Sequence, residues 1–327
     1  MVDRGLTTVD IPKSGKNFRF SEIRLGALVQ GWRLGIDIGG TFTDVIAVSP
    51  DGATRRSAKV PSQPQKPVRA ILDAIAAVDL GWAEVTEIVH GTTIVTNDIV
   101  EHRYRPCALV ATSGFADTIE IARGSRRHLY RMDALPRPHP LVPAHLRFEA
   151  TERLDHQGHV VTELTDAEIE RVVNEVRASG VDTVAVCLLH SFRNPDHEIR
   201  LGAALRAALP YVSLSHEVSP EFREFERMST TVLNAMMMAK IKHHLTLIDE
   251  AKPAESRLHL MHSASGMASP DLIAERPLML AMSGPAAGVA ASCRTARDLG
   301  VDHQITFDMG GTTTDVCLIV DGKAEVA

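Results

Sequence analysis

Two short runs of the chain combine aspartates, glycines and threonines in the same order, and these residue types can bind phosphate and a metal ion. The run Asp37–Val45 returns as Asp308–Val316, and the two nine-residue runs differ only at their second and sixth positions. Each lies between apolar stretches, so a strand, a Gly-Gly-Thr turn and a second strand are expected. Backbone N–H groups and threonine hydroxyls at such a turn can approach phosphate oxygens closely. An aspartate at the end of the first strand can hold Mg²⁺, usually through water.

The repeat also bears on architecture, because the two runs are 271 residues apart (308 minus 37). Two such hairpins suggest two related lobes that hold one nucleotide between them. Ordinary tight hairpins are the alternative, since Gly-Gly is a common turn. That alternative explains the glycines, but neither the aspartate before each pair nor the Thr-x-Thr-Asp after it. The sequence has no G-x-x-x-x-G-K-[ST] motif and no G-x-G-x-x-G after a strand, which argues against P-loop and dinucleotide-binding folds.

Two further stretches have the small and polar residues of a binding site. His90–Thr93 lies where a predicted strand passes into a helix, with Asn97 one or two turns later. Free N–H groups at such a helix start, with hydroxyls beside them, form an anion or carbonyl site. Simple N-capping by a threonine is the alternative. Ser283–Gly288 enters a helix rich in small residues, against which either a nucleotide or another helix could pack.

The densest ionic segment of the chain is Glu217–Arg227. On a helix, Arg223 and Arg227 share a face at i,i+4 spacing, next to Glu224. Such runs are usually solvated helix faces whose pairs add about 0.2–0.5 kcal/mol each. Residue types alone favour that interpretation here.

Length and composition restrict the classes of protein. A chain of 327 residues exceeds the size at which one core keeps growing, so two domains are expected. With 44% apolar and 4% aromatic residues, the chain is typical of a globular protein with aliphatic cores. The net charge of −6 gives no electrostatic reason to expect nucleic acid or an anionic membrane as a partner. The four cysteines are far apart and lack metal-ligand spacing, as in reduced cytoplasmic proteins.

Strands and helices alternate along the chain, which indicates an α/β fold with helices over a mixed sheet. Helical spacing predicts helices over Lys66–Val78 and Glu221–Glu250, and Thr165 begins another with a capping-box pattern. Strands are expected at Thr183–Leu189 and at Leu278–Met282. No apolar run reaches the length of a membrane span. Residues 1–31 lack a signal-peptide core and are expected to be a disordered extension or an over-long start.

Five segments resemble the hydantoinase A/5-oxoprolinase family, in particular N-methylhydantoinase A-like members. They occur in the family's order and cover nearly everything from Arg33 to the end. The segments are Leu34–Asp44, His90–Asn97, Glu217–Arg227 with Ser229–Thr231, Ser283–Gly288 and Asp308–Asp315. The family belongs to the actin-like ATPase superfamily, so the resemblance implies two ribonuclease-H-like lobes with ATP and Mg²⁺ in the cleft.

The resemblance also implies a domain organisation. Residues 32–215 match the family's N-terminal lobe, and residues 216–327 match the start of its hydantoinase A domain, including the second phosphate hairpin. Family members continue further, whereas this sequence stops at Ala327, so we expect an incomplete second lobe and the front half of a longer enzyme. The extension over 1–31 and the stretch Met261–Gly266 depart from the family pattern.

The activity implied by the resemblance is ATP-dependent hydrolysis of a cyclic amide, such as 5-oxoproline or a hydantoin, through phosphorylation of the amide oxygen. Asp37 and Asp308 are then the catalytic residues, which orient Mg²⁺, mostly through water. The other implied positions form three groups. Phosphates are held by Gly39, Gly40, Thr41, Thr43, Gly310, Gly311, Thr312 and Thr313; the substrate side comprises His90, Thr92, Thr93, Asn97, Arg223, Glu224 and Arg227; and Ser283, Gly284 and Gly288 line the nucleotide cleft.

The implied partners are a small cyclic amide and a hydantoinase B-like second subunit, in the cytoplasm, with homo-oligomerisation open. Two other functions also stay open. One is a β-subunit-like component of an acetone- or acetophenone-type carboxylase, and the other is a truncated nucleotide-binding remnant without activity alone. A sugar kinase fits the hairpins but neither the His90 segment nor Glu217–Arg227.

Overall fold

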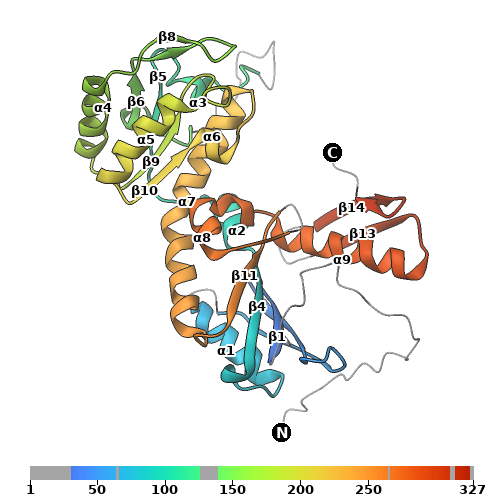
Figure 1. Ribbon diagram of the computed structural model, residues 1–327. Coiled ribbons are helices and arrows are strands. Elements are labelled where there is room, and N and C mark those ends of the chain that lie inside the picture. Colours follow the sequence, from blue (N-terminus) through green and yellow to red (C-terminus); the bar gives the residue numbers. More distant parts are fainter. Residues whose placement is uncertain (1–30, 64–65, 126–138, 264–265, 310–313, 325–327) are drawn as a thin grey trace. The chain divides into compact units, whose positions relative to one another are not determined.

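The computed structural model describes residues 31–63, 66–125, 139–263, 266–309 and 314–324. Residues 1–30 of the extension expected over residues 1–31, and the turn Gly310–Thr313 of the second run, lie outside these residues. The chain forms two compact units, whose elements are labelled in Figure 1. Among the described residues, unit 1 comprises those up to Asn97, those in Lys242–Ala274 and those from Met279 onward, and unit 2 comprises those in Asp98–Ile241 and Glu275–Leu278.

Unit 1 is built on a six-stranded mixed sheet with the strand order β12-β11-β4-β1-β2-β3. β1, β2 and β3 form an antiparallel meander, while β4 and β11 run parallel to β1. The strands are β1 (Trp32–Ile38), β2 (Phe42–Val48), β3 (Arg55–Pro61), β4 (Val85–Thr92), β11 (Arg257–Met261) and β12 (Met267–Ala268).

The inner face of this sheet packs against helix α1 (Pro67–Ala77), which contacts β1, β2 and β3. Ile36 and Val45 are directly paired and almost fully buried on this face. Because successive side chains of a strand point to opposite faces, Asp37 and Asp44 lie on the outer face. The strand pattern therefore separates the core of unit 1 from its carboxylates.

Helix α9 (Ser283–Leu299) and a small antiparallel sheet complete unit 1. The small sheet has the order β13-β14-β15, formed by Gln304–Met309, Thr314–Val320 and Lys323–Ala324. α9 contacts all three of these strands and also β4 and β11 of the larger sheet. The helix thereby brings the second repeated run into the same unit as the first. The shorter helices with residues in unit 1 are η1 (Trp82–Glu84), α2 (Ile94–Val100), α8 (Pro270–Glu275) and η3 (Pro277–Leu280).

Unit 2 contains a four-stranded sheet in the order β10-β9-β5-β6, and all of its pairings are parallel. Helices α4 and α5 lie side by side against this sheet (Figure 1) and bury an aliphatic core with it. Such strands, buried on both faces, are almost continuously apolar, and in Thr183–Cys187 every residue is buried and only the first is polar. The elements are β5 (Ala108–Thr112), α3 (Thr118–Ile121), η2 (Ala144–Leu146), β6 (Arg147–Ala150), β7 (Arg153–Leu154), β8 (Val160–Thr162), α4 (Asp166–Ala178), β9 (Thr183–Cys187), α5 (Asp196–Ala208), β10 (Tyr211–Leu214), α6 (Ser215–Val218) and the first part of α7 (Glu224–Ala251).

One predicted strand is wrong. Leu278–Met282 does not extend a sheet, because Pro277–Leu280 forms a 3₁₀ turn followed by an irregular turn. Pro277 has no N–H for a strand ladder, and the Leu278 N–H donates instead to Asn234 Oδ1 at 3.2 Å. A short apolar run cannot distinguish a buried strand from a buried helical turn. None of the helices within the described ranges has the length and apolar composition needed to cross a membrane.

Candidate functional site

The first repeated run forms the expected hairpin between β1 and β2. Asp37, next to the end of β1, is directly paired with Asp44 of β2. The turn is closed by the Gly39 N–H, which donates to the Phe42 carbonyl at 3.0 Å. A Cβ atom on Gly39 would lie 3.0 Å from that carbonyl oxygen, so this position has no room for a side chain. Glycine therefore lets the hairpin close tightly at this position.

Strand register forms a row of four residues across the sheet: Lys59 of β3, Asp44 of β2, Asp37 of β1 and Gly91 of β4. Directly paired residues share a face, so this cross-strand row lies on the outer face. A Cβ atom on Gly91 would lie only 3.1 Å from Asp37 Oδ1. Glycine at this position makes room for the carboxylate. Lys59 Nζ donates to Asp44 Oδ2 at 2.6 Å.

The segment from β4 into α2 lies beside the first turn. Asn97 Nδ2 donates to Thr93 Oγ1 at 3.1 Å, and the Asn97 N–H donates to the Thr93 carbonyl at 2.9 Å. The Thr93 N–H in turn reaches the Ile38 carbonyl at 3.4 Å. A Cβ atom on Gly40 would lie 3.7 Å from Asn97 Nδ2. Thr93 and Asn97 therefore flank the turn that was expected to bind phosphate.

The first turn of α9 reaches the same place. Ser283 is buried, and its Oγ donates to the Thr92 carbonyl at 3.1 Å. A Cβ atom on Gly284 would lie 4.0 Å from Asp37 Oδ2. The preceding Met282 has a left-handed backbone (φ 60°), and its N–H donates to a threonine hydroxyl of α2 at 3.0 Å. These contacts fix the N-terminus of α9, whose partial positive charge favours anions, beside Asp37.

The second repeated run pairs its strands in the same register as the first. Asp308 is directly paired with Asp315, as Asp37 is with Asp44. A pocket of about 590 Å³ lies between this hairpin and α9. Its lining includes Pro285, Gly288 and Ser292 of α9 together with Asp308 and Asp315. Gly288, expected in the nucleotide cleft, therefore lines a cavity next to the second pair of aspartates.

The charges around Asp37 are unbalanced. Its pKa is raised, mainly because neighbouring protein atoms partly desolvate the carboxylate, and further because Asp44 and Asp308 are negatively charged. The ammonium group of Lys59 acts in the opposite direction. The contribution of Asp308 means that the two hairpins influence each other electrostatically, although 271 residues separate them in sequence. Added positive charge would relieve this repulsion.

Three residues assigned to the site, Thr43, His90 and Thr92, face the interior instead, and Thr92 is fully buried opposite Ile38 of β1. Thr43 is fully buried, and its Oγ1 is 2.9 Å from Ser62 Oγ. His90 is also fully buried, and its Nε2 is 3.1 Å from Nε2 of His244 in α7. Burial lowers the pKa of His90 to about 4, so the ring is neutral near pH 7. All three residues alternate with the outward-facing row, which is why they point inward.

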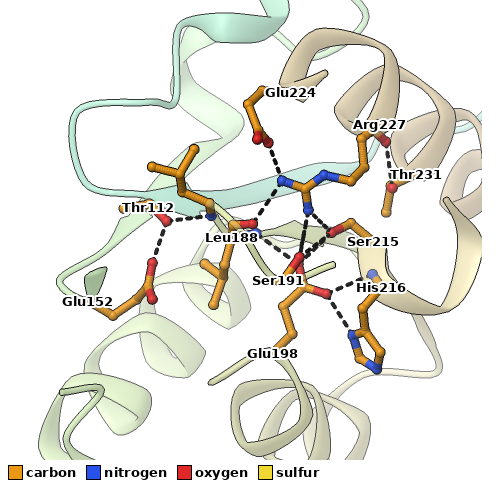
Figure 2. Close-up of polar contacts among 11 residues, drawn as sticks. Thr112, Glu152, Leu188, Ser191, Glu198, Ser215, His216, Glu224, Arg227 and Thr231 are labelled. Carbon is orange, nitrogen blue, oxygen red and sulfur yellow. Dashed lines mark hydrogen bonds and ion pairs between the residues drawn. The ribbon is translucent and has the colours of Figure 1, made fainter. Parts of the chain in front are cut away.

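Arg227 lies in unit 2, inside a buried hydrogen-bond network (Figure 2). Its side chain is fully buried, forms an ion pair with Glu224 and lies 4.0 Å from a carboxylate oxygen of Glu198. It also donates to the Leu188 carbonyl at 3.0 Å and to Ser191 Oγ at 2.6 Å. These partners give Arg227 a structural task in unit 2. Its assignment to the substrate side, with those of Glu224 and the exposed Arg223, stays a prediction.

Two buried carboxylates anchor that network, and neither was assigned to a site from the sequence. Glu198 accepts from the Leu188 N–H at 2.8 Å, from Ser215 Oγ at 2.6 Å and from His216 Nδ1 at 2.7 Å. Glu152 accepts from His197 Nδ1 at 2.7 Å and from a threonine hydroxyl at the end of β5. Parallel strands bring their carboxyl ends to one edge of a sheet, which is where these groups meet. Only the three-dimensional arrangement of the strands reveals them.

Three members of the cross-strand row were also not assigned from the sequence. Asp44 belongs to the repeated run, and its direct pairing with Asp37 is the expected register of a short hairpin, so that signal was available. Gly91 lies inside the His90 motif, but its closeness to Asp37 depends on the pairing of β1 with β4. Lys59 belongs to no motif, and only its pairing with Asp44 brings it to the site.

Comparison with known protein families identifies the chain. Residues 33–209 match the hydantoinase/oxoprolinase N-terminal region, and residues 227–327 match the hydantoinase/oxoprolinase model that follows it. The chain belongs to the hydantoinase/oxoprolinase family. The two matches contain the first and second hairpins respectively, so this family member carries both repeated runs within regions typical of the family.

Curated relatives of this family member include enzymes of two kinds. The caprolactamase subunit alpha of Pseudomonas jessenii is 36% identical over 308 residues, which are 90% of this chain and 44% of the relative. The 5-oxoprolinase of Saccharomyces cerevisiae is 26% identical over 337 residues, covering 90% of this chain and 26% of the relative. The acetone carboxylase beta subunit of Xanthobacter autotrophicus is 26% identical over 320 residues, with 90% and 44% covered. The chain thus spans less than half the length of these relatives.

Solved structures support the same grouping. A nucleotide-free structure of acetone carboxylase, from work on ATP-dependent acetone carboxylation, matches with a TM-score of 0.77 and 26% identity over 90% of this chain and 44% of that one. The ATP-dependent caprolactamase from Pseudomonas jessenii matches with a TM-score of 0.73 and 34% identity over 88% of this chain and 43% of that one. The family member therefore has the α/β fold of the actin-like ATPase type, as predicted.

Proposed function

We propose that this chain supplies the ATP-binding part of an ATP-dependent hydrolase that opens a cyclic amide of the 5-oxoproline or hydantoin type. The observation that carries the proposal is the pair of hairpins with equal register, together with the effect of Asp308 on the pKa of Asp37. Caprolactamase and 5-oxoprolinase among the relatives support hydrolysis of an amide as the reaction class.

Magnesium suits the residues at this place, and we include it in the proposal. Within the described residues, no three His, Cys, Asp or Glu side chains lie close enough together to hold a metal ion by themselves. Mg²⁺ commonly keeps several waters and binds through one or two carboxylates plus phosphate oxygens. Asp37 and Asp308 are carboxylates of the right kind, and the excess negative charge around Asp37 favours a cation. When bound, Mg²⁺ supplies positive charge that neutralises phosphate oxygens.

The chain's own residues act mainly by holding and orienting the nucleotide. N–H groups of Gly40 and Thr41 in the turn donate to phosphate oxygens, and the N-terminus of α9 adds partial positive charge beside Asp37. Phosphate transfer to the amide oxygen of the substrate turns a poor electrophile into an activated imidate, which water attacks. Catalysis of this kind rests on positioning and on charge neutralisation at the γ-phosphoryl group.

A second candidate is a component of an acetone- or acetophenone-type carboxylase, and the match to acetone carboxylase with a TM-score of 0.77 supports it. The nucleotide chemistry at Asp37 is the same in both proposals, and the acceptor of the phosphoryl group differs. In both, we propose a second, hydantoinase B-like subunit, because relatives are named as subunits alpha, beta and gamma. The two functions separate when the chain and the neighbouring gene product are assayed for ATP turnover with cyclic amides and with ketones plus bicarbonate.

The aspartates test the shared part of the proposal. Asp37→Asn and Asp308→Asn each remove a negative charge and keep the shape, so each is expected to lower ATP turnover by about 10²-fold or more. Asp302→Asn, in an exposed loop of the same unit, is the matched control and is expected to have wild-type turnover. Wild-type turnover in both hairpin variants would mean that the aspartates are structural turn residues and that the proposed site is wrong.

A further inference from the structure

Lys59 extends the candidate site beyond the residues that the repeated runs contain. It lies on β3, one strand beyond Asp44 and two strands beyond Asp37, within the cross-strand row. Neighbouring strands are about 4.8 Å apart, so its Cα lies about 10 Å from that of Asp37. The ammonium group lies 5.3 Å from the centre of the Phe42 ring, at the first residue of β2 after the turn. The side chain therefore leans toward the tip of the hairpin.

The ammonium group of Lys59 is available to a ligand. The side chains of Lys59 and Asp44 are 56% and 54% exposed, so their ion pair at 2.6 Å is a surface pair. Exposed pairs of this kind contribute only about 0–1 kcal/mol to stability, so little free energy is lost when Lys59 leaves Asp44 for another partner. A lysine carries its charge on a long flexible stem with three donors, which suits phosphate oxygens.

The negative charges around the site favour a nearby cation such as the Lys59 ammonium group. Asp37 and Asp44 are on the first hairpin, and Asp308 and Asp315 are on the second. A bound nucleoside triphosphate therefore adds negative charge to a site that is already negatively charged. Lys59 is a cation that already acts on the Asp37 carboxylate. A group with this charge and this reach stabilises a bound phosphate and the charge that develops as it transfers.

We propose that Lys59 is a phosphate-binding catalytic residue whose ammonium group exchanges Asp44 for an oxygen of the terminal phosphate of bound ATP. This inference rests on the proposed nucleotide-binding function. In the transfer step, the acceptor oxygen forms a bond to the γ-phosphorus while the bond to the β,γ-bridging oxygen breaks, and ADP leaves with that electron pair. Lys59 keeps its proton throughout and neutralises charge on the transferring group.

Calorimetric titration of the full chain with Mg²⁺–ATP and with Mg²⁺–ADP tests the inference, because only ATP carries the terminal phosphate. Lys59→Met keeps the length and removes the charge, and it is expected to weaken ATP binding about tenfold to a hundredfold with little change for ADP. Lys59→Arg is expected to restore most of the ATP affinity. Asp44→Asn is expected to strengthen ATP binding, because it frees the ammonium group and removes a negative charge. A merely structural ion pair would instead make Lys59→Met and Asp44→Asn weaken binding alike.

Arg55→Met is the matched control, since Arg55 is exposed on the same face of β3 at its other end, and it is expected to bind both nucleotides as the wild type does. Equal ATP affinity in Lys59→Met and the wild type overturns the inference, and so does an equal loss for ATP and ADP. If the wild-type chain binds neither nucleotide, the proposed function fails and the inference fails with it. If the wild-type chain binds ATP and Lys59→Met binds it with the same affinity, the inference is rejected while the proposed function stands.

Discussion

The buried histidine pair of unit 1 makes a prediction that does not depend on any assignment of function. His90 is fully buried, its Nε2 lies 3.1 Å from that of His244, and burial lowers its pKa from 6.5 to about 4. The folded-state pKa is thus below the unfolded value. As the pH falls below about 6.5, the unfolded chain takes up a proton at this position while the folded chain does not. The stability that His90 contributes is therefore complete near neutral pH and is lost progressively down to about pH 4.

The size of the effect follows from the same values. Each pKa unit between the folded and unfolded states corresponds to about 1.4 kcal/mol, so the gap between 6.5 and about 4 amounts to about 3 kcal/mol. His90→Gln keeps a polar side chain beside His244 and cannot titrate in this range. Its free energy of unfolding is expected to fall by about 3 kcal/mol less than that of the wild type between pH 7 and pH 4.

Urea titrations followed by tryptophan fluorescence measure this difference, because both tryptophans, Trp32 and Trp82, belong to unit 1. His156→Gln is the matched control, since His156 is an exposed histidine in a turn of unit 2. The control is expected to follow the wild type across the whole pH range. Parallel stability profiles for the wild type and His90→Gln would refute the link between burial of this ring and acid sensitivity.

Two further predictions follow from close packing and buried charge. Gly91→Ala is expected to lower ATP turnover about tenfold, because the new Cβ would lie 3.1 Å from Asp37 Oδ1 and displace the carboxylate. Gly35→Ala is the control, since Gly35 lies on the same face and no heavy atom would lie within 4 Å of its Cβ. Equal ATP turnover in the two variants would contradict the reasoning. Arg227→Met is expected to destabilise unit 2 by about 3–5 kcal/mol, because it leaves Glu198 buried without its positive neighbour, and adding Glu198→Gln is expected to recover part of that loss. Amide hydrogen exchange of unit 2 measures the stability of the single and the double variant. An Arg227→Met variant as stable as the wild type would show that the guanidinium is dispensable.

Local sequence was sufficient where neighbours in the chain decide the structure. The repeated runs form hairpins with the same pairing of their aspartates, because alternation and a glycine turn fix the register within a few residues. Thr165 caps α4 as predicted, with its Oγ1 accepting from the Glu168 N–H at 3.2 Å. A long helix over Glu221–Glu250 was likewise expected, and α7 covers Glu224–Ala251. In these cases, the interactions that stabilise the element join residues close together in the sequence.

Local sequence was insufficient where partners come from distant strands. The strand wrongly predicted at Leu278–Met282 is one case, because the Leu278 N–H donates to the side chain of Asn234 and not to a neighbouring strand. The environment of Arg227 is another, because its ion pairs look like a solvated helix face in the sequence and prove to be buried with Glu198. Burial multiplies the energetic importance of a charge, and burial is a property of the assembled unit rather than of the segment.

The sequence by itself determined the family, the two hairpins and the aspartates near the ends of their first strands, because these depend on residue identity and on turn chemistry over nine residues. Only the tertiary structure decided which groups stand around Asp37. The pairing of β1 with β4 brings Gly91 to it, the pairing of β2 with β3 brings Lys59 into its row, and the packing of α9 brings the second hairpin within electrostatic reach. Coulomb interactions and close contacts depend on distance in space, and the folded sheet sets those distances.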